Sequence, residues 1–165
     1  VPDTILKDFC LCIDDQKPKT HHVIAANEGN AIALATGYHF ATNKIPLVYM
    51  QNSGLGNAIN PLLSLCDSEV YSIPLILLIG WRGEPGVKDE PQHVVQGEIT
   101  VPMLNLLNIK TCVIRNKSNL QQLSRLISYS KKRNRPVACL IEKGTLIAKK
   151  NINEIYKILG LKKFT

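Results

Sequence analysis

The sequence lacks the features that mark membrane, fibrous and disordered proteins. Its longest apolar run, residues 73–80, contains Pro74 and is far shorter than the ~18 residues of a membrane-spanning helix. Internal repeats, low-complexity stretches and obvious linkers are also absent. With 45% hydrophobic and 20% charged residues, the composition is that of a globular protein. The 165 residues therefore suit one domain with a single core.

The cysteines show neither the spacing of a metal site nor the pattern of a disulfide framework. They are odd in number and lie mostly within apolar runs: Cys10, Cys12, Cys66, Cys112 and Cys139. We therefore favour reduced core thiols and a cytoplasmic location. The chain opens with Val1-Pro2-Asp3, without a methionine or a signal peptide. We expect that the start was either processed or is missing from this sequence.

Charge is distributed unevenly along the chain. Residues 1–110 contain 7 Lys and Arg against 11 Asp and Glu, whereas residues 111–165 contain 13 against 2. A basic C-terminal third can indicate nucleic-acid binding, but no aromatic residue lies among the cations of residues 131–135, so base stacking has little support. We favour a simpler interpretation, in which these cations end a helix and the later lysines are solvated. No nucleic-acid or membrane partner is expected.

The alternation of apolar and helical segments predicts an α/β fold with a parallel sheet. The strand candidates are residues 22–26, 45–51, 74–81, 111–115 and 136–142. Most are continuous apolar runs, which suits strands that are covered on both faces. The helix candidates are residues 3–12, 28–42, 57–66, 101–107, 119–132 and 152–159. Asn27 and Ser118 are the candidate N-caps of the second and fifth of these helices.

Three polar segments follow predicted strands and are expected to share one edge of the sheet. They are Asn27-Glu28, Asn52-Ser53-Gly54 and the long loop from Arg82 to Gln96. Ligands of open α/β sheets bind beyond the carboxyl ends of the strands. A loop as long as Arg82 to Gln96 in a compact domain is usually functional or mobile. The carboxyl edge of the sheet is therefore the candidate site.

The segment that begins at Asn52 follows a strand and opens a helix. Its Gly54-x-Gly56 is part of a dinucleotide-binding fingerprint, but Ile59 stands where the third glycine belongs, and the next strand ends without an acidic residue. Two interpretations stay open. The glycines either let the backbone approach a ligand, or they form a tight turn between a strand and a helix.

Three further features have both a functional and a structural interpretation. Glu28 lies in the first turn of a predicted helix, where the helix dipole favours its ionised form, and many such residues are simply helix-start residues. Gly29, Ala33 and Gly37 follow at a spacing of four, which lets another backbone come close, within the domain or across a subunit contact. Arg82 and His93 share a loop with three acidic residues, and they suit either an anionic substrate or a solvated loop. These three acids are Glu84, Asp89 and Glu90.

Taken together, the motifs resemble those of one enzyme family. They are Val1-Pro2-Asp3, Ala26–Asn30, Tyr49–Asn57, Gly80–His93 and Glu142–Thr145. Over residues 1–148 they are similar to the pyrimidine-binding half of the phosphonopyruvate decarboxylases, which depend on thiamine diphosphate. The α subunits of sulfopyruvate decarboxylases are the alternative within the same superfamily.

The resemblance implies a three-layer α/β/α architecture around a parallel sheet, the pyrimidine-type thiamine diphosphate-binding fold. The first strand of that fold lies inside the sheet and would precede Val1, so it is expected to be missing here. We expect residues 1–148 to form this domain. Residues 149–165 are expected to form a basic tail that includes a short helix.

The resemblance also implies a reaction, the decarboxylation of 3-phosphonopyruvate to phosphonoacetaldehyde and carbon dioxide in phosphonate biosynthesis. Glu28 falls at the position of the family's activating glutamate, which hydrogen-bonds N1′ of the cofactor's aminopyrimidine. That bond favours the tautomer that removes the thiazolium C2 proton.

The other site residues follow from the same comparison of motifs. The residues expected to line the pyrimidine site are Asn52, Ser53, Gly54 and Asn57. Asp3 matches an active-site acid, and Gln92 and His93 match a loop that faces the substrate. We assign Arg82 to the phosphonate group because of its charge and its place at the end of a strand.

The second half of such an enzyme has no counterpart in this sequence. No Gly-Asp-Gly followed by a downstream Asn occurs, so the Mg²⁺ and diphosphate site is expected on a partner domain or subunit of a homo- or hetero-oligomer. The chain alone is expected to be inactive. A catalytically idle interaction module is the alternative from another functional class, and the intact Glu28 and residues 82–93 argue against it.

Overall fold

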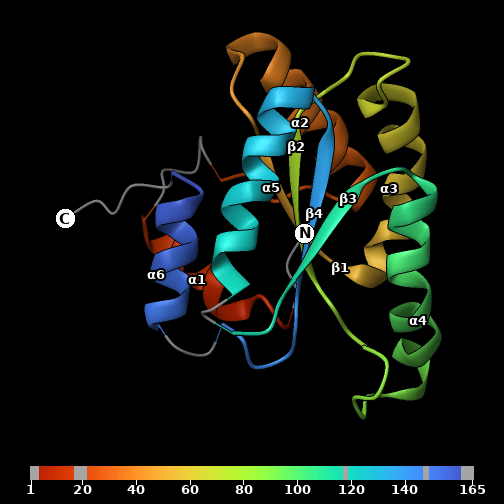
Figure 1. Cartoon of the computed structure of the whole chain (residues 1–165), viewed down its shortest axis with the longest axis vertical. Helices are drawn as coiled ribbons and strands as arrows, with labels where there is room; N and C mark the ends of the chain where they lie inside the picture. Colours follow the sequence, from red (N-terminus) through yellow and green to blue (C-terminus); the bar gives the residue numbers. More distant parts are fainter. Residues whose placement is uncertain (1–3, 17–21, 117–118, 147–148, 161–165) are drawn as a thin grey trace.

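The computed structural model describes residues 4–16, 22–116, 119–146 and 149–160 (Figure 1). One parallel sheet lies at its centre, with the strand order β1-β2-β4-β3. The strands are β1 (Leu47–Gln51), β2 (Leu75–Gly80), β3 (Lys110–Ile114) and β4 (Pro136–Ile141). All four carboxyl ends therefore lie at one edge of the sheet. The predicted α/β class is confirmed.

Helices cover both faces of the sheet and make three layers (Figure 1). The α-helices are α1 (Lys7–Gln16), α2 (Glu28–Thr42), α3 (Leu55–Pro61), α4 (Pro91–Leu106), α5 (Leu120–Arg133) and α6 (Lys149–Ile158). Two short elements flank α3: the 3-10 turn η1 (Asn52–Gly54) and the π-helical turn η2 (Leu62–Cys66). Helices α2, α3 and α4 pack on one face, and α1, α5 and α6 pack on the other.

Side chains of the central strands alternate between the two faces of the sheet and join separate core clusters. In β2, Leu75, Leu77 and Ile79 join the cluster under α2, α3 and α4, whereas Leu78 joins the cluster under α1, α5 and α6. Every residue of β2 and β4 is buried. This burial on both faces explains why these strands are continuous apolar runs rather than alternating ones.

Asparagine residues begin or end several helices. Asn27 caps α2, because its Oδ1 accepts a hydrogen bond of 2.9 Å from the Asn30 amide, and this predicted cap is confirmed. Asn43 ends α2 and Asn134 ends α5, with φ of 56° and 49°. Asparagine tolerates this left-handed conformation better than most residues. The predicted cap Ser118 lies outside the described residues.

The prediction of a strand at residues 22–26 is wrong, because this segment is irregular. The exposed fractions of Val23 and Ile24 are 62% and 59%, and no described strand lies beyond β1 to pair with them. An isolated apolar run cannot satisfy its backbone groups as a strand. The His22 ring instead bonds Asp14 and the Tyr49 hydroxyl, each at 2.7 Å.

The predicted bounds of one loop and of the helix after it also need correction. The predicted loop of residues 82–96 ends at Glu90, because α4 begins at Pro91, where a missing N–H costs nothing and φ is already helical. The predicted helix 101–107 is thus the second half of a longer one. Helix α6 falls within the predicted tail, and its Ile155 and Tyr156 are buried in one core cluster with Phe9 of α1.

The predicted stripe on α2 makes one close contact. A Cβ at Gly29 would lie 2.9 Å from the carbonyl oxygen of Asn57, so this glycine lets α2 approach the start of α3. A Cβ at Gly37 would meet nothing within 4 Å, and Ala33 is exposed. Within this stripe, Gly29 therefore packs inside the domain, whereas Ala33 and Gly37 face outward.

Candidate active site

The carboxyl edge of the sheet brings together most of the residues that the motifs singled out. The segment from Asn52 to Asn57 follows β1, Glu28 begins α2 beside it, and a loop follows β2. We call residues 82–90, which connect β2 to α4, the edge loop. It lies at the lower right of Figure 1. The predicted convergence of three polar segments at one edge is therefore present in the structure.

Glu28 is held over the turn that follows β1. Its Oε2 accepts a hydrogen bond of 3.0 Å from Asn57 Nδ2 at the start of α3. A Cβ at Gly54 would lie 2.4 Å from the Glu28 carboxyl carbon, so only glycine leaves room for the glutamate there. The Glu28 side chain is half-buried, and within the described part of the chain Oε1 carries no hydrogen bond. One carboxylate oxygen thus stays available at the sheet edge.

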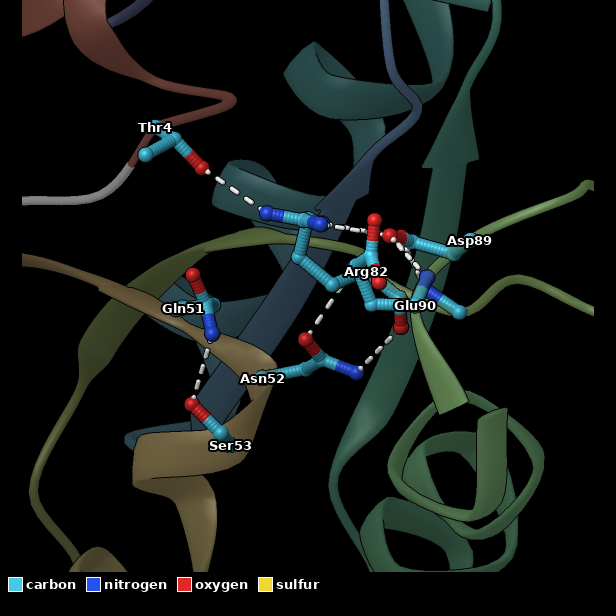
Figure 2. A network of polar contacts seen from close by, with 8 residues as sticks. Thr4, Gln51, Asn52, Ser53, Arg82, Asp89 and Glu90 are labelled. Atoms are coloured by element: carbon cyan, nitrogen blue, oxygen red, sulfur yellow. Dashed lines mark hydrogen bonds and ion pairs between the residues drawn. The ribbon is translucent and has the colours of Figure 1, made fainter. Parts of the chain in front are cut away.

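Asn52 is a connector between three elements. Its exposed fraction is 2%, its Oδ1 accepts from the Arg82 amide at 3.0 Å, and its Nδ2 donates to the Arg82 carbonyl at 2.8 Å (Figure 2). The same Nδ2 donates to Thr100 Oγ1 at 3.0 Å. The side chain therefore joins the end of β1 to the end of β2 and to α4. Because its side-chain amide is fully used in these hydrogen bonds, Asn52 stabilises the turn after β1 rather than offering a group to a ligand.

Arg82 forms an ion pair inside the edge loop. Its Nε and Nη2 donate to the two carboxylate oxygens of Asp89 at 2.8 and 2.5 Å, and its Nη1 donates to Thr4 Oγ1 at 3.3 Å (Figure 2). Asp89 also accepts from the amides of Gly83 and Glu90, each at 2.9 Å. The hydrogen bonds from Arg82 hold the pKa of Asp89 well below its usual range.

This geometry argues against the predicted role of Arg82. A guanidinium that grips a substrate anion needs its paired N–H groups free, whereas here they are occupied by Asp89. The sequence placed three acidic residues within eight positions of Arg82, and nothing in their spacing singled out Asp89. The structure selects Asp89 among these acids, and this carboxylate closes the edge loop on itself.

The edge loop is also fixed to α4 by backbone contacts. A Cβ at Gly83 would lie 1.8 Å from the His93 carbonyl oxygen, and a Cβ at Gly97 would lie 1.6 Å from the Gly83 carbonyl oxygen. Trp81 Nε1 donates to the Gly97 carbonyl at 3.0 Å. Two glycines thus let the start of the loop lie directly on the helix, with Trp81 beneath it.

The remaining predicted residues occupy different positions relative to this edge. Gln92 is exposed and His93 half-buried, both in the first turn of α4. Ser53 is exposed, and its Oγ accepts from Gln51 Nε2 at 2.8 Å. Asp3 lies outside the described residues. No group of three or more His, Cys, Asp or Glu side chains among the described residues could hold a metal ion.

All five cysteines are free thiols, and Cys66 and Cys139 are buried. Burial raises the pKa of the Cys66 thiol. No described helix is both long enough and apolar enough to cross a membrane. The predicted basic cluster of residues 131–135 ends α5, as expected for cations at a helix C-terminus.

Comparison with known proteins gives matches of two kinds. Residues 1–104 match the model of the thiamine pyrophosphate enzyme, N-terminal TPP binding domain. The chain is 40% identical over 97 residues to phosphonopyruvate decarboxylase of Streptomyces viridochromogenes, an alignment that covers 59% of this chain and 24% of that protein. The chain thus spans about a quarter of the length of this relative.

Two further relatives are shorter proteins. The chain is 33% identical over 129 residues to subunit alpha of sulfopyruvate decarboxylase of Methanothermobacter thermautotrophicus, covering 78% of this chain and 76% of that subunit. The corresponding subunit of Methanococcus maripaludis is 35% identical over 109 residues, covering 66% and 62%. Thiamine pyrophosphate and thiamine diphosphate are the same cofactor. The chain therefore belongs to the family of thiamine pyrophosphate enzymes and carries their N-terminal, cofactor-binding domain.

Proposed function

We propose that this chain is the pyrimidine-binding half of a thiamine diphosphate-dependent decarboxylase that converts 3-phosphonopyruvate to phosphonoacetaldehyde and carbon dioxide. The single observation that carries the proposal is Glu28, whose carboxylate lies over Gly54 and is oriented by Asn57. The named activity of the 40% identical relative supports the choice of substrate. In phosphonate biosynthesis this reaction would consume the keto acid and release the aldehyde.

The residues around Glu28 fit an aminopyrimidine ring. Thiamine diphosphate, when bound, supplies the carbon nucleophile and the electron sink that no amino-acid side chain offers. Glu28 would hold a proton between its free oxygen and a ring nitrogen, as a general acid-base group at the ring edge. The hydrogen bond from Asn57 orients the Glu28 carboxylate. Gly54 has no side chain, so the turn leaves space beside this carboxylate for a flat ring.

The other cofactor and substrate residues keep proposed roles of different kinds. Ser53 would contact the cofactor from the exposed side of the turn, and Asn52 would act indirectly by fixing that turn. Gln92 and His93 would face the substrate from the first turn of α4, and Asp3 would supply a further acid. Arg82 would position the edge loop rather than bind the phosphonate group, because Asp89 occupies its guanidinium.

The diphosphate and Mg²⁺ would be held by a second domain or subunit. The name of the Methanothermobacter relative, a subunit alpha, supports a partner chain. We propose a homo- or hetero-oligomer in the cytoplasm, with a small anionic 2-keto acid as substrate. Without the diphosphate-binding half, the chain would bind cofactor weakly and would not turn over substrate.

Sulfopyruvate is the second candidate substrate, and one observation favours it. The alignment of the chain with the Methanothermobacter subunit alpha extends over 129 residues, against 97 residues with the Streptomyces enzyme. Both substrates are three-carbon keto acids with an anionic group at C3, so the same site chemistry serves either.

The test is a decarboxylation assay of the chain together with its diphosphate-binding half, with both keto acids as substrates. Glu28→Gln should lower carbon dioxide release by about 100-fold to 10,000-fold, because it removes one proton-transfer group and almost no volume. Glu98→Gln, an exposed position on α4, is the matched control and should change little. Near-normal turnover of Glu28→Gln would refute the mechanism. Failure of the wild-type protein to bind thiamine diphosphate would favour the idle interaction module.

A further inference from the structure

Three charged side chains from three different segments meet at the carboxyl edge, beside the site described above. Glu84 lies in the edge loop, Arg115 follows β3 and Glu142 follows β4. Arg115 Nη2 donates to Glu84 Oε1 at 3.1 Å, and Arg115 Nε pairs with Glu142 Oε1. Glu84 is close enough to Glu142 to raise the pKa of its carboxyl group. We call these three residues the acidic clamp.

The charges of the acidic clamp do not balance when both carboxyl groups are ionised. Two carboxylates then face one guanidinium, and the exposed fractions of the Glu84 and Glu142 side chains are only 12% and 18%. Neighbouring carboxylates with little access to water resist joint ionisation. Among the described residues, the charged groups that act on Glu142 are Glu84 and Arg115. The favoured state of the clamp is therefore one carboxylate, one carboxylic acid and one guanidinium.

Protonation of Glu142 falls in the physiological range. Burial and the neighbouring Glu84 raise the pKa of Glu142 to about 7, against the opposing effect of Arg115. Below this pH the clamp is neutral overall, and the protonated carboxyl group donates its hydrogen bond. Above it the clamp carries one excess negative charge, and Glu84 and Glu142 repel each other.

The acidic clamp joins the edge loop to the far side of the sheet. Glu84 is its one member in the loop, and the Glu84 carbonyl accepts from the Val87 amide at 3.0 Å in the turn at the loop's tip. The Trp81 amide donates at 2.9 Å to the Ile141 carbonyl, directly before Glu142. The clamp and Trp81 thus span the same junction between the ends of β2 and β4.

We propose that the acidic clamp is a proton-dependent latch that positions the edge loop. With one proton on its carboxyl pair, the latch holds the loop against the ends of β3 and β4, and loss of that proton loosens the loop. Since the loop leads into Gln92 and His93, its position would set where α4 presents these side chains. The latch itself does not depend on the proposed decarboxylase activity, whereas its effect on turnover does.

Trp81 provides a direct readout of the latch. It is the single tryptophan of the sequence, its exposed fraction is 8%, and it lies at the root of the edge loop. We expect the emission of Trp81 to change between pH 5.5 and 8.5 with a midpoint near 7. Glu142→Gln should remove this transition, because an amide keeps the hydrogen-bonding capacity and cannot ionise. Glu98→Gln is the control and should leave the transition in place.

Each outcome of the fluorescence titration bears on the latch. Loss of the transition in Glu142→Gln and in Glu84→Gln, with its retention in Glu98→Gln, supports it. A midpoint that persists in Glu142→Gln assigns the transition to another group and overturns the latch. Emission of the wild-type protein that is constant across this range overturns it too.

Proteolysis gives a second readout that does not rely on Trp81. Lys88 is exposed near the end of the edge loop, and a lysine-specific endoprotease cleaves after it only when the loop opens. Relative to a peptide of the loop sequence, cleavage of the wild-type protein should be several-fold faster at pH 8.5 than at pH 6. The Glu142→Gln variant should be cleaved at the same relative rate at both pH values. A pH dependence in this variant equal to that of the wild-type protein would overturn the latch. Neither readout measures decarboxylation, so failure of the proposed function would leave both interpretable.

Discussion

The edge loop is attached at two places that have the same kinds of groups in different numbers. At Arg82 and Asp89, one guanidinium meets one carboxylate, and two backbone amides add further hydrogen bonds. In the acidic clamp, one guanidinium meets two carboxyl groups. The matched pair stays ionised far into acid, whereas the clamp retains a proton up to neutral pH. The number of carboxyl groups for each arginine therefore decides which attachment is permanent and which responds to pH.

The two attachments also contribute to stability with opposite signs of pH dependence. The folded-state pKa of Asp89 lies below its unfolded value, so its contribution is present above the unfolded pKa and is lost as the pH falls. The folded-state pKa of Glu142 lies above its usual value, at about 7, so its contribution is present in acid and is lost as the pH rises toward 7. Between the unfolded pKa of Asp89 and about pH 7, the edge loop is therefore held both by the Arg82–Asp89 pair and by the acidic clamp.

The largest effect is expected from breaking the matched pair. Arg82→Met leaves the Asp89 carboxylate, whose side chain is 6% exposed, without its guanidinium, and we expect a loss of about 3 kcal/mol in the free energy of unfolding. Chemical denaturation measures this loss. Turnover of phosphonopyruvate and of pyruvate should fall in equal proportion, because the whole loop moves. A selective loss on phosphonopyruvate with unchanged stability would instead restore Arg82 as a substrate ligand.

A smaller effect is expected from the backbone contact between Gly83 of the edge loop and Gly97 of α4. Gly97→Ala places a Cβ 1.6 Å from the Gly83 carbonyl oxygen and must displace the loop, which should cost about 2 kcal/mol at every pH. Gly56→Ala is the matched control, since a Cβ in this helical position meets nothing within 4 Å. The control should change the free energy of unfolding by less than about 1 kcal/mol. Equal effects of the two substitutions would contradict the close contact.

The smallest effect on stability is expected from the arginine of the acidic clamp. The Arg115 side chain is 54% exposed, so Arg115→Met should change the free energy of unfolding by less than about 1 kcal/mol. Its effect on titration should be clear, because Arg115 lowers the pKa of Glu142. The midpoint of the Trp81 transition should therefore move to higher pH in this variant. A midpoint that moves to lower pH would contradict the charge assignment of the clamp.

Local patterns in the sequence were enough to predict much of this molecule. The four strands are apolar runs that end at proline, asparagine or charge, and Asn27 at the start of α2 is a local cap signal. The turn around Gly54 and the position of Glu28 follow from the same short-range patterns. Because parallel strands share one carboxyl edge, their polar ends could be placed together before any geometry was known.

The parts that were predicted wrongly depend on contacts between distant segments. The first half of α4 buries Gly97 and Thr100 rather than large apolar residues, so it has no apolar periodicity to identify it. Val23 and Ile24 have the composition of a strand, but no neighbouring strand is described beside them. Likewise, Arg82 has three acidic residues near it in the chain, and only the folded loop selects Asp89.

The contact between Gly83 and Gly97 has a consequence for how this loop can change over evolutionary time. A Cβ at Gly97 would meet the Gly83 backbone, and a Cβ at Gly83 would meet the His93 backbone, so a substitution at either position requires the loop to move relative to α4. Such a pair is a coupled constraint: a tolerated change at one position depends on an insertion or a new loop path at the other. The exposed Pro85, Val87 and Lys88, which lie between these anchors and the Asp89 closure, are freer to vary in composition. Sequence drift in this part of the protein should therefore alter the tip of the loop while its base stays fixed.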